Sequence, residues 1–254
     1  MQKTTYLLIV LIVITLSISL IRRDAFSVDT PADAQQVGNQ KDGKPDRYQE
    51  AKRHFPTVDY DEPNLPDTEE NRARKEKKKR FNDLGNWVSK FTQPYIRENR
   101  SSAVNLDFPA LPVAKSDIIL IGVVAETKAH LSENKRNVFS ELAVDVETVF
   151  KTSNKQVRPG SIISVDRMGG VVKYPNGQLV LYRRAGMHIP KFGGRYLFFL
   201  NLLNKHDYGI LTAYELTETG VVALDMSPQF FALEGKSETE VLSELRGLLQ
   251  NSSN

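Results

Sequence analysis

Residues 138–151 read VFSELAVDVETVFK. Within this stretch Leu142, Val144, Val146 and Phe150 alternate with the residues between them, which is the period of a β-strand with one buried face. The pattern therefore predicts a long strand, one of a series that fills the C-terminal half of the chain.

Shorter strands are predicted on both sides of this one. Apolar or alternating runs bounded by turn residues indicate them, at 117–124, 161–165, 171–174, 178–182, 195–200, 208–216 and 221–224. Asn176-Gly177 between two of these runs is the strongest short signal for a hairpin, and Gly169-Gly170 permits a bulge or a sharp bend. Because no helical pattern separates the strands, we expect an antiparallel β-barrel or sandwich. The long strand and the glycine bends favour a small barrel.

One helix is predicted at the C-terminal end. Ser237-Glu238-Thr239-Glu240 has the form of a capping box. The apolar residues after it recur on one helical face: Val241, Leu242, Leu245, Leu248 and Leu249. Together with the strands, this helix defines a mainly β domain over residues 115–254.

The N-terminal segment, residues 1–23, predicts a transmembrane anchor or a secretory signal. Residues 6–21 carry no charge and consist mostly of leucine, isoleucine and valine. As a helix they rise about 24 Å, slightly less than a bilayer core of about 30 Å. Ser17-Ile18-Ser19 is compatible with signal cleavage, but Arg22-Arg23 directly after it favours an uncleaved anchor. We expect a single-pass membrane protein with an extracytoplasmic C-terminal domain; the alternative is a secreted or periplasmic form after cleavage.

Residues 24–114 differ in composition from the β domain. Proline recurs, charges of both signs alternate and apolar residues are scattered, so this segment is predicted to be a largely disordered linker. A helix is expected around 67–91, because acids in a first turn precede seven basic residues within 72–80. We interpret the basic run as a solvated spacer rather than a patch for anionic lipid or nucleic acid. Phe81 begins an apolar cluster at helical spacing that is expected to pack on the domain.

No pattern in the chain predicts a catalytic, metal or cofactor site. The absence of cysteine excludes disulfides, thiolate zinc sites and cysteine nucleophiles. None of the four histidines stands in a metal-ligand spacing: His54, His130, His188 and His206. Ser161, Asp166 and His188 could be combined into a triad, but no motif surrounds them. An extracytoplasmic hydrolase with an unrecognised active site is therefore the alternative class of function.

The charges of the β domain are segregated along the chain. Residues 151–205 contain ten basic residues and one acid, whereas residues 206–254 contain two basic residues and eight acids. One interpretation is a basic face around the hairpin of residues 171–182, which binds a polyanion, a lipid headgroup or an acidic partner. Its candidate residues are Arg167, Lys173, Tyr174, Tyr182, Arg183, Arg184, Lys191 and Arg195. The other interpretation is an electrostatic fit between these basic strands and acidic elements of the same domain.

These strands and turns resemble a family of bacterial proteins with one β-barrel-like domain behind an N-terminal signal or anchor. The motifs that carry the resemblance are Leu111-Pro112, Ser116-Asp117, Phe139-Ser140-Glu141-Leu142, Val149-Phe150-Lys151, Pro159-Gly160-Ser161, Gly169-Gly170 and the strand from Gly193 to Leu200. A looser similarity links the domain to netrin-like and metalloprotease-inhibitor modules, which share a barrel of the oligonucleotide/oligosaccharide-binding (OB) type. The resemblance implies an OB-like barrel and a membrane or exported location, but no activity. The modules of the looser similarity usually depend on cysteines, which this chain lacks.

The function predicted from the sequence is that of a non-catalytic binding or scaffold module held at the membrane. Its partner is expected to be a protein or a polyanionic ligand, and no cofactor or metal is expected. Nucleic acid is not an expected partner, because the net charge is only +3 and the domain is expected to be exported. The sequence carries no signal for an oligomeric state.

Overall fold

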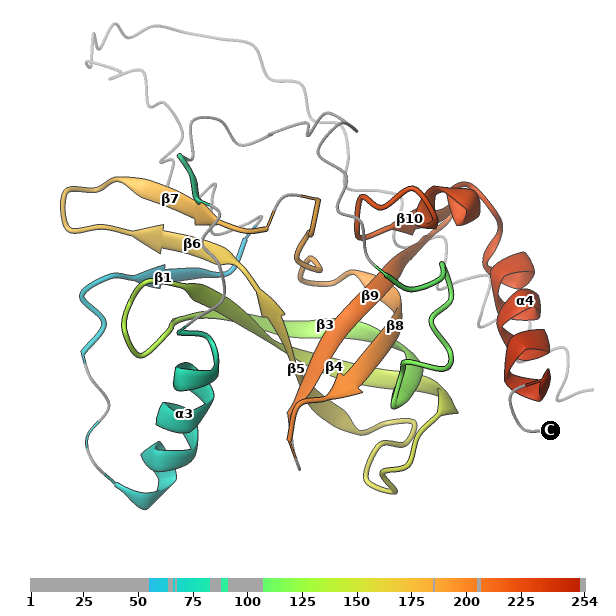
Figure 1. Cartoon of the computed structure of the whole chain (residues 1–254), viewed down its shortest axis with the longest axis horizontal. Coiled ribbons are helices and arrows are strands. Elements are labelled where there is room, and N and C mark those ends of the chain that lie inside the picture. The colour runs from blue at the N-terminus through green and yellow to red at the C-terminus, as the bar shows by residue number, and fades with distance from the viewer. Residues whose placement is uncertain are drawn as a thin grey trace, which may run out of the picture. The chain divides into compact units, whose positions relative to one another are not determined.

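The stretch at 138–151 forms strand β4 (Val138–Lys151) in the computed structural model of the chain (Figure 1). The structure describes residues 55–63, 66, 68–82, 88–90, 107–184, 186–204 and 207–251. Leu142, Val144 and Val146 of β4 are buried on one face, which confirms the predicted alternation as far as Val146. The ladder shifts its register after Val146, and Phe150 packs on the opposite face rather than on the predicted one. The predicted anchor or signal segment, residues 1–23, lies outside the described residues. Within the described ranges, no helix combines the length and the apolar character that a membrane span requires.

Strand β4 is central in a six-stranded sheet that contains most of the domain. The other strands of this main sheet are β3 (Ile118–Leu131), β5 (Ile162–Met168), β8 (Arg195–Leu202), β9 (Tyr208–Thr217) and β10 (Gly220–Ala223). The strand order is β10-β9-β5-β4-β3-β8, and β9 also pairs with β8. All pairs are antiparallel except β5 with β9, which run parallel. The pairings therefore connect β3, β4, β5, β9 and β8 in a closed circuit.

A second, smaller sheet consists of four short strands, one of which begins directly after β5. Its order is β1-β6-β7-β2, and its strands are β1 (Thr57–Asp59), β6 (Gly170–Lys173), β7 (Leu179–Tyr182) and β2 (Val88–Lys90). Gly169 and Gly170 have φ angles of 111° and 152° where β5 gives way to β6, and they provide the predicted bend. The predicted hairpin joins β6 to β7, with Gly177 at a φ of 78° in its turn.

Three elements of the folded unit come from the predicted linker: β1, α3 and β2. Strand β1 pairs in parallel with β6, with Thr57 opposite Val171. Helix α3 (Glu69–Arg80) lies inside the window predicted for a helix, and Phe81 directly after it stacks on Phe139 of β4 at a centroid distance of 4.0 Å. The prediction of helix as far as residue 91 is wrong at residues 88–90, which form β2 and pair with β7. The folded part of the chain therefore begins before the predicted boundary of the β domain.

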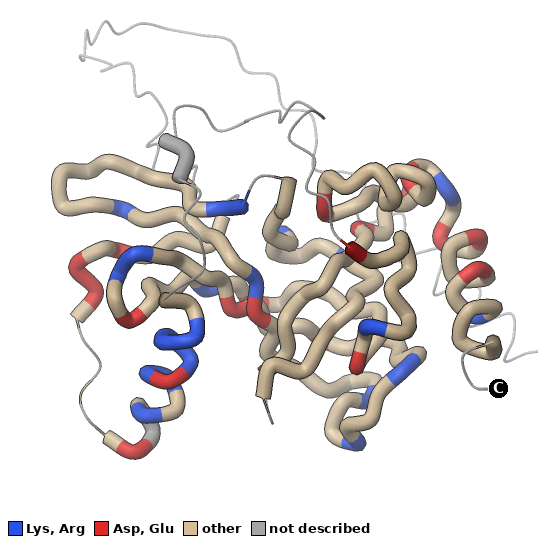
Figure 2. Tube along the Cα trace, viewed as in Figure 1, with Lys and Arg blue, Asp and Glu red and all other residues tan. Residues whose placement is uncertain are grey.

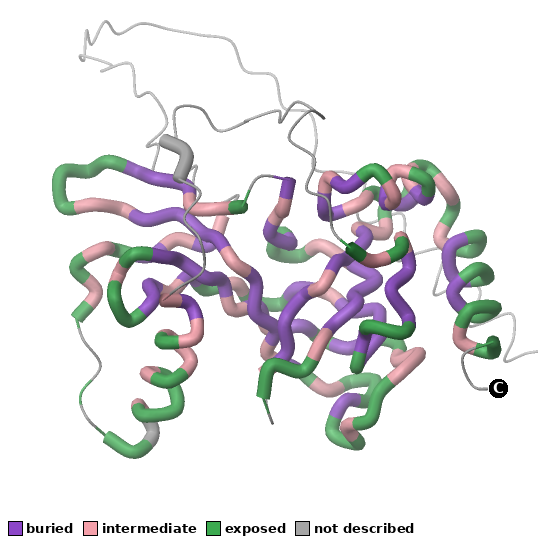
Figure 3. The backbone as a smooth tube through the Cα atoms, viewed as in Figure 1, coloured by how far each residue is buried: buried purple, intermediate pink, exposed green. Residues whose placement is uncertain are grey.

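The main sheet buries separate apolar clusters on its two faces, and Figure 3 shows the long buried stretches along its strands. Strand β8 shows the division most clearly, because its side chains alternate between the two clusters. Phe198 and Leu200 belong to one cluster, and Leu197 and Phe199 belong to the other. All four side chains are inaccessible to solvent, so this strand is buried on both faces. Its continuous apolar sequence follows from that position.

Helix α4 (Glu238–Asn251) begins with the predicted capping box. The Ser237 amide donates to the Glu240 carboxylate at 2.8 Å, and the Glu240 amide donates to the Ser237 hydroxyl at 3.3 Å. The short 3-10 helix η2 (Phe230–Leu233) precedes it. Three apolar residues of α4 pack on the second cluster: Val241, Leu242 and Leu245. The prediction of a mainly β domain with a C-terminal helix is confirmed.

Gly122 lies at an irregularity of the β3–β4 ladder, where the register shifts after Ile121. A Cβ atom at this position would lie 2.6 Å from the backbone oxygen of Asp145 and 2.6 Å from a methyl carbon of Val144. We expect Gly122→Ala to lower the free energy of unfolding by about 1–3 kcal/mol, because the backbone of β4 has to shift. Urea titration followed by circular dichroism measures this loss.

Gly247→Ala is the matched control for this substitution. Gly247 lies in the interior of α4, and a Cβ atom there meets nothing within 4 Å. Alanine is therefore expected to stabilise the helix by about 0.5–1 kcal/mol. Unchanged stability of the Gly122→Ala variant would contradict the close approach of β3 and β4 at this point.

Candidate functional site

The eight residues predicted for a basic face do not gather on one surface. Figure 2 shows lysine and arginine residues distributed over both sheets and α3 rather than concentrated at the β6–β7 hairpin. Arg167 is 2 % exposed, and its guanidinium donates to Asp225, to the His188 carbonyl at 2.9 Å and to the Ile210 carbonyl at 3.2 Å. A buried arginine with three partners cannot contribute to a binding surface. Arg167 is therefore a structural residue.

Two more of the predicted residues are paired with acids of the same domain. Arg195 forms a two-pronged ion pair with Glu238 of α4, at 2.7 Å and 3.0 Å, and its Nε donates to Glu147 of β4 at 2.6 Å. The Lys191 ammonium lies 3.3 Å from Glu215 of β9. These contacts match the interpretation in which basic strands fit electrostatically to acidic neighbours and to the acidic helix.

Three predicted residues do meet on the β6–β7 hairpin. The Tyr174 and Tyr182 hydroxyls share a hydrogen bond of 2.5 Å, and Tyr60 stacks on Tyr174 at a centroid distance of 4.9 Å. Lys173 lies 3.9 Å from Asp59 of β1. The tyrosine rings therefore contact one another instead of standing free for a ligand. Arg183 and Arg184 directly follow β7, with Arg184 exposed.

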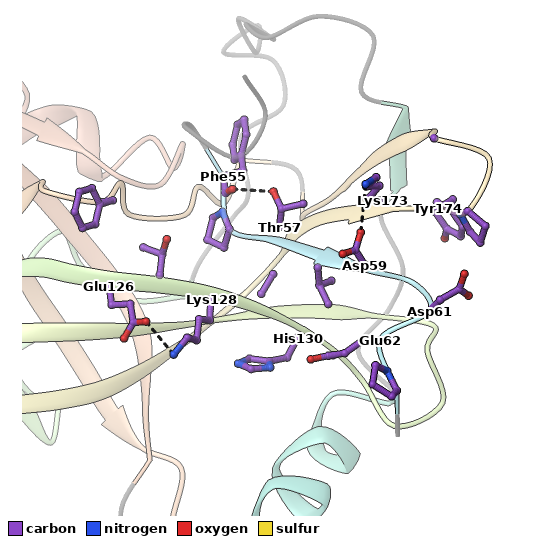
Figure 4. A pocket seen from close by; sticks show the side chains of 18 residues that line it. Phe55, Thr57, Asp59, Asp61, Glu62, Glu126, Lys128, His130, Lys173 and Tyr174 are labelled. Carbon is purple, nitrogen blue, oxygen red and sulfur yellow. Dashed lines mark hydrogen bonds and ion pairs between the residues drawn. The ribbon is translucent and has the colours of Figure 1, made fainter. Parts of the chain in front are cut away.

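A hollow lies between β1, β3 and this hairpin (Figure 4). It is an open groove with a volume of about 1250 Å³. One wall is β1 with the residues after it, and the other is the second half of β3, from Glu126 to His130. Phe192, in the loop before β8, lines the groove with 70 % of its surface exposed. An aromatic side chain this exposed beside a groove is typical of a contact surface for a partner.

Carboxylates outnumber ammonium groups in this groove. Its charged lining residues are Asp59, Asp61, Glu62, Glu126, Lys128 and Lys173. Lys128 lies 2.9 Å from Glu126, and Lys78 of α3 approaches Glu62 at 3.7 Å. Burial lowers the pKa of His130, so this residue is neutral at pH 7. The lining of the groove therefore carries a net negative charge of two.

A cluster of partly buried ion pairs, which was not predicted from the sequence, fixes α3 to the main sheet. The Lys77 ammonium lies 2.5 Å from Glu141 of β4, 2.7 Å from Asp166 of β5 and 3.4 Å from Asp207 before β9. The Arg80 guanidinium lies 2.6 Å from Asp207. Burial raises the pKa of Asp166 to about 6 in spite of Lys77. A signal was present in the sequence, because Asp166 is the only acid among ten basic residues and stands within an apolar strand.

The residues of the conceivable triad have separate partners. The Ser161 hydroxyl donates to the Arg158 carbonyl at 2.6 Å, and Asp166 is paired with Lys77. The His188 Nδ1 is 2.8 Å from the Leu224 carbonyl oxygen. The structure does not bring the three together. Among the described residues, no group of three histidine or acidic side chains is arranged to hold a metal ion.

Comparison with known proteins gave no further assignment. No family model matches the chain, and neither the search of curated proteins nor that of solved structures gave a match. The candidate site therefore has to be interpreted from its own geometry. That geometry offers an open acidic groove with an exposed aromatic residue, bordered by two strands.

Proposed function

We propose that this chain is a membrane-tethered, non-catalytic binding module that takes a protein partner in the groove between β1 and β3. The observation that carries the proposal is the groove itself, with Phe192 exposed at its edge. Its volume of about 1250 Å³ exceeds the range of about 300–1,000 Å³ of pockets that enclose small molecules. An open groove of this size suits a polymer segment better than a metabolite.

A protein partner is preferred over a polyanion because of the charges. Arg167, Lys191 and Arg195 have acidic partners within the domain. The groove lining carries more carboxylates than ammonium groups, which disfavours phosphate or sulfate groups by like-charge repulsion. Nucleic acid is disfavoured for the same reason.

We infer that the domain is a small barrel of the OB type. Support comes from the closed circuit of pairings through β3, β4, β5, β9 and β8. In this circuit three strands follow one another as a meander, and a β8–β9 hairpin returns to close it with the parallel β5–β9 pair. The resemblance to exported bacterial β-barrel domains leads to the same inference. We further infer a single-pass anchor at residues 1–23 and an extracytoplasmic position of the domain.

Site-specific photo-crosslinking tests the proposed function. Phe192 is replaced by a benzoylphenylalanine residue in the full-length chain, which is illuminated in native membranes; the membranes are washed with carbonate afterwards. We expect retention in the washed membranes and a discrete protein adduct from position 192, because this side chain borders the groove.

The control places the same crosslinker at Leu248, which is 43 % exposed on α4. We expect the adduct to be absent there, since α4 does not line the groove. Loss of the chain on carbonate washing would refute the anchor. Adducts to lipid or nucleic acid alone, or equal adducts from both positions, would refute a protein partner in the groove.

A further inference from the structure

Among the described strands, none pairs with one edge of β3 over its second half. From Ile118 to Val123 it pairs with β4 on one side and with β8 on the other. The last contact on the β8 side is at Val124, which exchanges hydrogen bonds with Gly193 and Gly194. Beyond this point β3 pairs only with β4 among the described strands. Residues 126–130 of this half line the groove.

The ladder geometry shows which backbone groups this edge presents. The Ser132 amide donates across the hairpin to the Asn137 carbonyl at 2.9 Å. In an antiparallel ladder, successive residues direct their N–H and C=O groups to opposite sides. Thr127, Ala129 and Leu131 therefore direct theirs away from β4, and Thr127 and Ala129 line the groove. No described strand pairs with β3 on that side.

The facing strand β1 is arranged in the same way. The Val171 amide donates to the Pro56 carbonyl at 2.8 Å, and the Tyr60 amide donates to the Lys173 carbonyl at 2.9 Å. These bonds fix the side of β1 that faces β6. Thr57 and Asp59 consequently direct their backbone groups away from β6, and both residues line the groove. The Asp59 carbonyl already accepts a hydrogen bond from the Glu62 amide at 3.0 Å, so the edge of β3 offers the longer row of backbone groups that no described strand pairs with.

We propose that the partner enters this groove as an extended peptide that carries basic residues and adds a strand to the edge of β3 at residues 127–131. This inference rests on the proposed function and names the form of its partner. Unpaired strand edges bind extended peptides through their backbone groups. A strand also presents alternate side chains to opposite sides, where the groove offers Phe192 and an excess of carboxylates. The net negative lining selects a basic segment over an acidic one.

The test uses two fluorescent peptides, acetyl-VKVKVKV-amide and acetyl-VEVEVEV-amide, and measures binding by fluorescence anisotropy. We expect the basic peptide to bind the wild-type chain at least about tenfold more tightly than the acidic peptide. Hydrogen exchange should also slow at the amides of Thr127 and Ala129 when the basic peptide is bound. A version of the basic peptide with alternate backbone amides methylated should bind at least about fivefold more weakly, since each methyl removes a donor.

Thr127→Pro is the matching change in the protein. It removes an N–H that points away from β4, so the native ladder keeps its bonds, and proline is tolerated at an exposed strand edge. We expect about fivefold weaker binding of the basic peptide. Lys128→Ala is the control, because the backbone of Lys128 faces β4; it should bind the basic peptide no more weakly than the wild type.

The possible outcomes separate this inference from the proposed function. If the crosslink at position 192 persists while the basic peptide neither binds nor protects the two amides, strand addition is wrong and the groove binds its partner in another way. If both fail, the proposed function fails as well. A dimer in sedimentation that Thr127→Pro abolishes would replace the peptide with a second copy of the chain.

Discussion

Replacing Asp225 by alanine is expected to lower the free energy of unfolding by about 3–5 kcal/mol. Asp225 and Arg167 form an ion pair in which the side chains are 0 % and 1 % exposed. Burial raises the pKa of Asp225 against the opposing effect of Arg167. Without the carboxylate, the guanidinium of Arg167 would keep its two carbonyl acceptors but remain as an uncompensated buried charge. Urea unfolding followed by circular dichroism measures the loss.

The double variant Arg167→Met with Asp225→Leu is the control. It removes both charges and keeps apolar side chains in the buried space, so most of the stability lost in the single variant should return. If Asp225→Ala lowers the free energy of unfolding by less than about 1 kcal/mol, the pair is not buried in solution. The assignment of Arg167 to the interior would then be wrong, and its place on a basic surface would have to be reconsidered.

Asp166 is expected to make the domain more stable as the pH falls, which is opposite to the usual effect of a carboxylate. Its pKa is about 6 in the folded chain and near 3.9 in an unfolded one. Between these values the folded state binds the proton more tightly, so the free energy of unfolding rises on acidification. The unfolded carboxyl group is still about half ionised at pH 4, so this difference in pKa corresponds to about 2 kcal/mol between pH 7 and pH 4.

The surroundings of Asp166 determine how this effect is measured. Lys77 and Arg80 favour its charged form, whereas Glu141 and Asp207 oppose it. The other carboxylates titrate in the same range, so the quantity to follow is the stability of the wild type minus that of Asp166→Asn. This difference should rise by about 2 kcal/mol from pH 7 to pH 4.

Asp207→Asn provides a control of opposite sign. Burial opposes the charge of Asp207, but its hydrogen bond from Arg80 and the charge of Lys77 lower its pKa overall. The contribution of Asp207 is therefore present at neutral pH and disappears as the pH falls through its lowered pKa. If the wild type and Asp166→Asn change in parallel over the whole range, the carboxyl group of Asp166 is not buried against α3.

The local parts of the fold were predictable because their signals lie within a few residues. The alternation in β4, the Asn176-Gly177 turn and the capping box at Ser237 each involve neighbouring residues only, and the structure contains all three. Strand β1 has three residues and a parallel partner far along the chain. A run of three residues is too short to show the two-residue period of a strand, and a parallel pair has no local turn that would indicate it in the sequence. The pairing of β1 was therefore beyond prediction.

The predicted basic face illustrates a second limit of prediction from the sequence. Charge can be counted along a sequence, but the direction of each side chain depends on the strand register. The alternation through Ile163 and Val165, both buried, places Arg167 on the same face as these residues, so its burial could have been predicted. The partners of Lys191 and Arg195 lie on β4, β9 and α4. These contacts exist only in the assembled fold.

The parallel pairing of β1 with β6 also determines the order in which the chain can mature during synthesis. Both β1 and α3 are synthesised before the residues that they contact. Strand β1 pairs with β6 at Val171, and α3 forms ion pairs with Glu141, Asp166 and Asp207. Strand β1 and helix α3 therefore stay without these partners until nearly all of the later strands have been synthesised. Until then this basic helix and this strand edge are available to other proteins. A chain that is exported while still unfolded would thus need protection chiefly at its beginning.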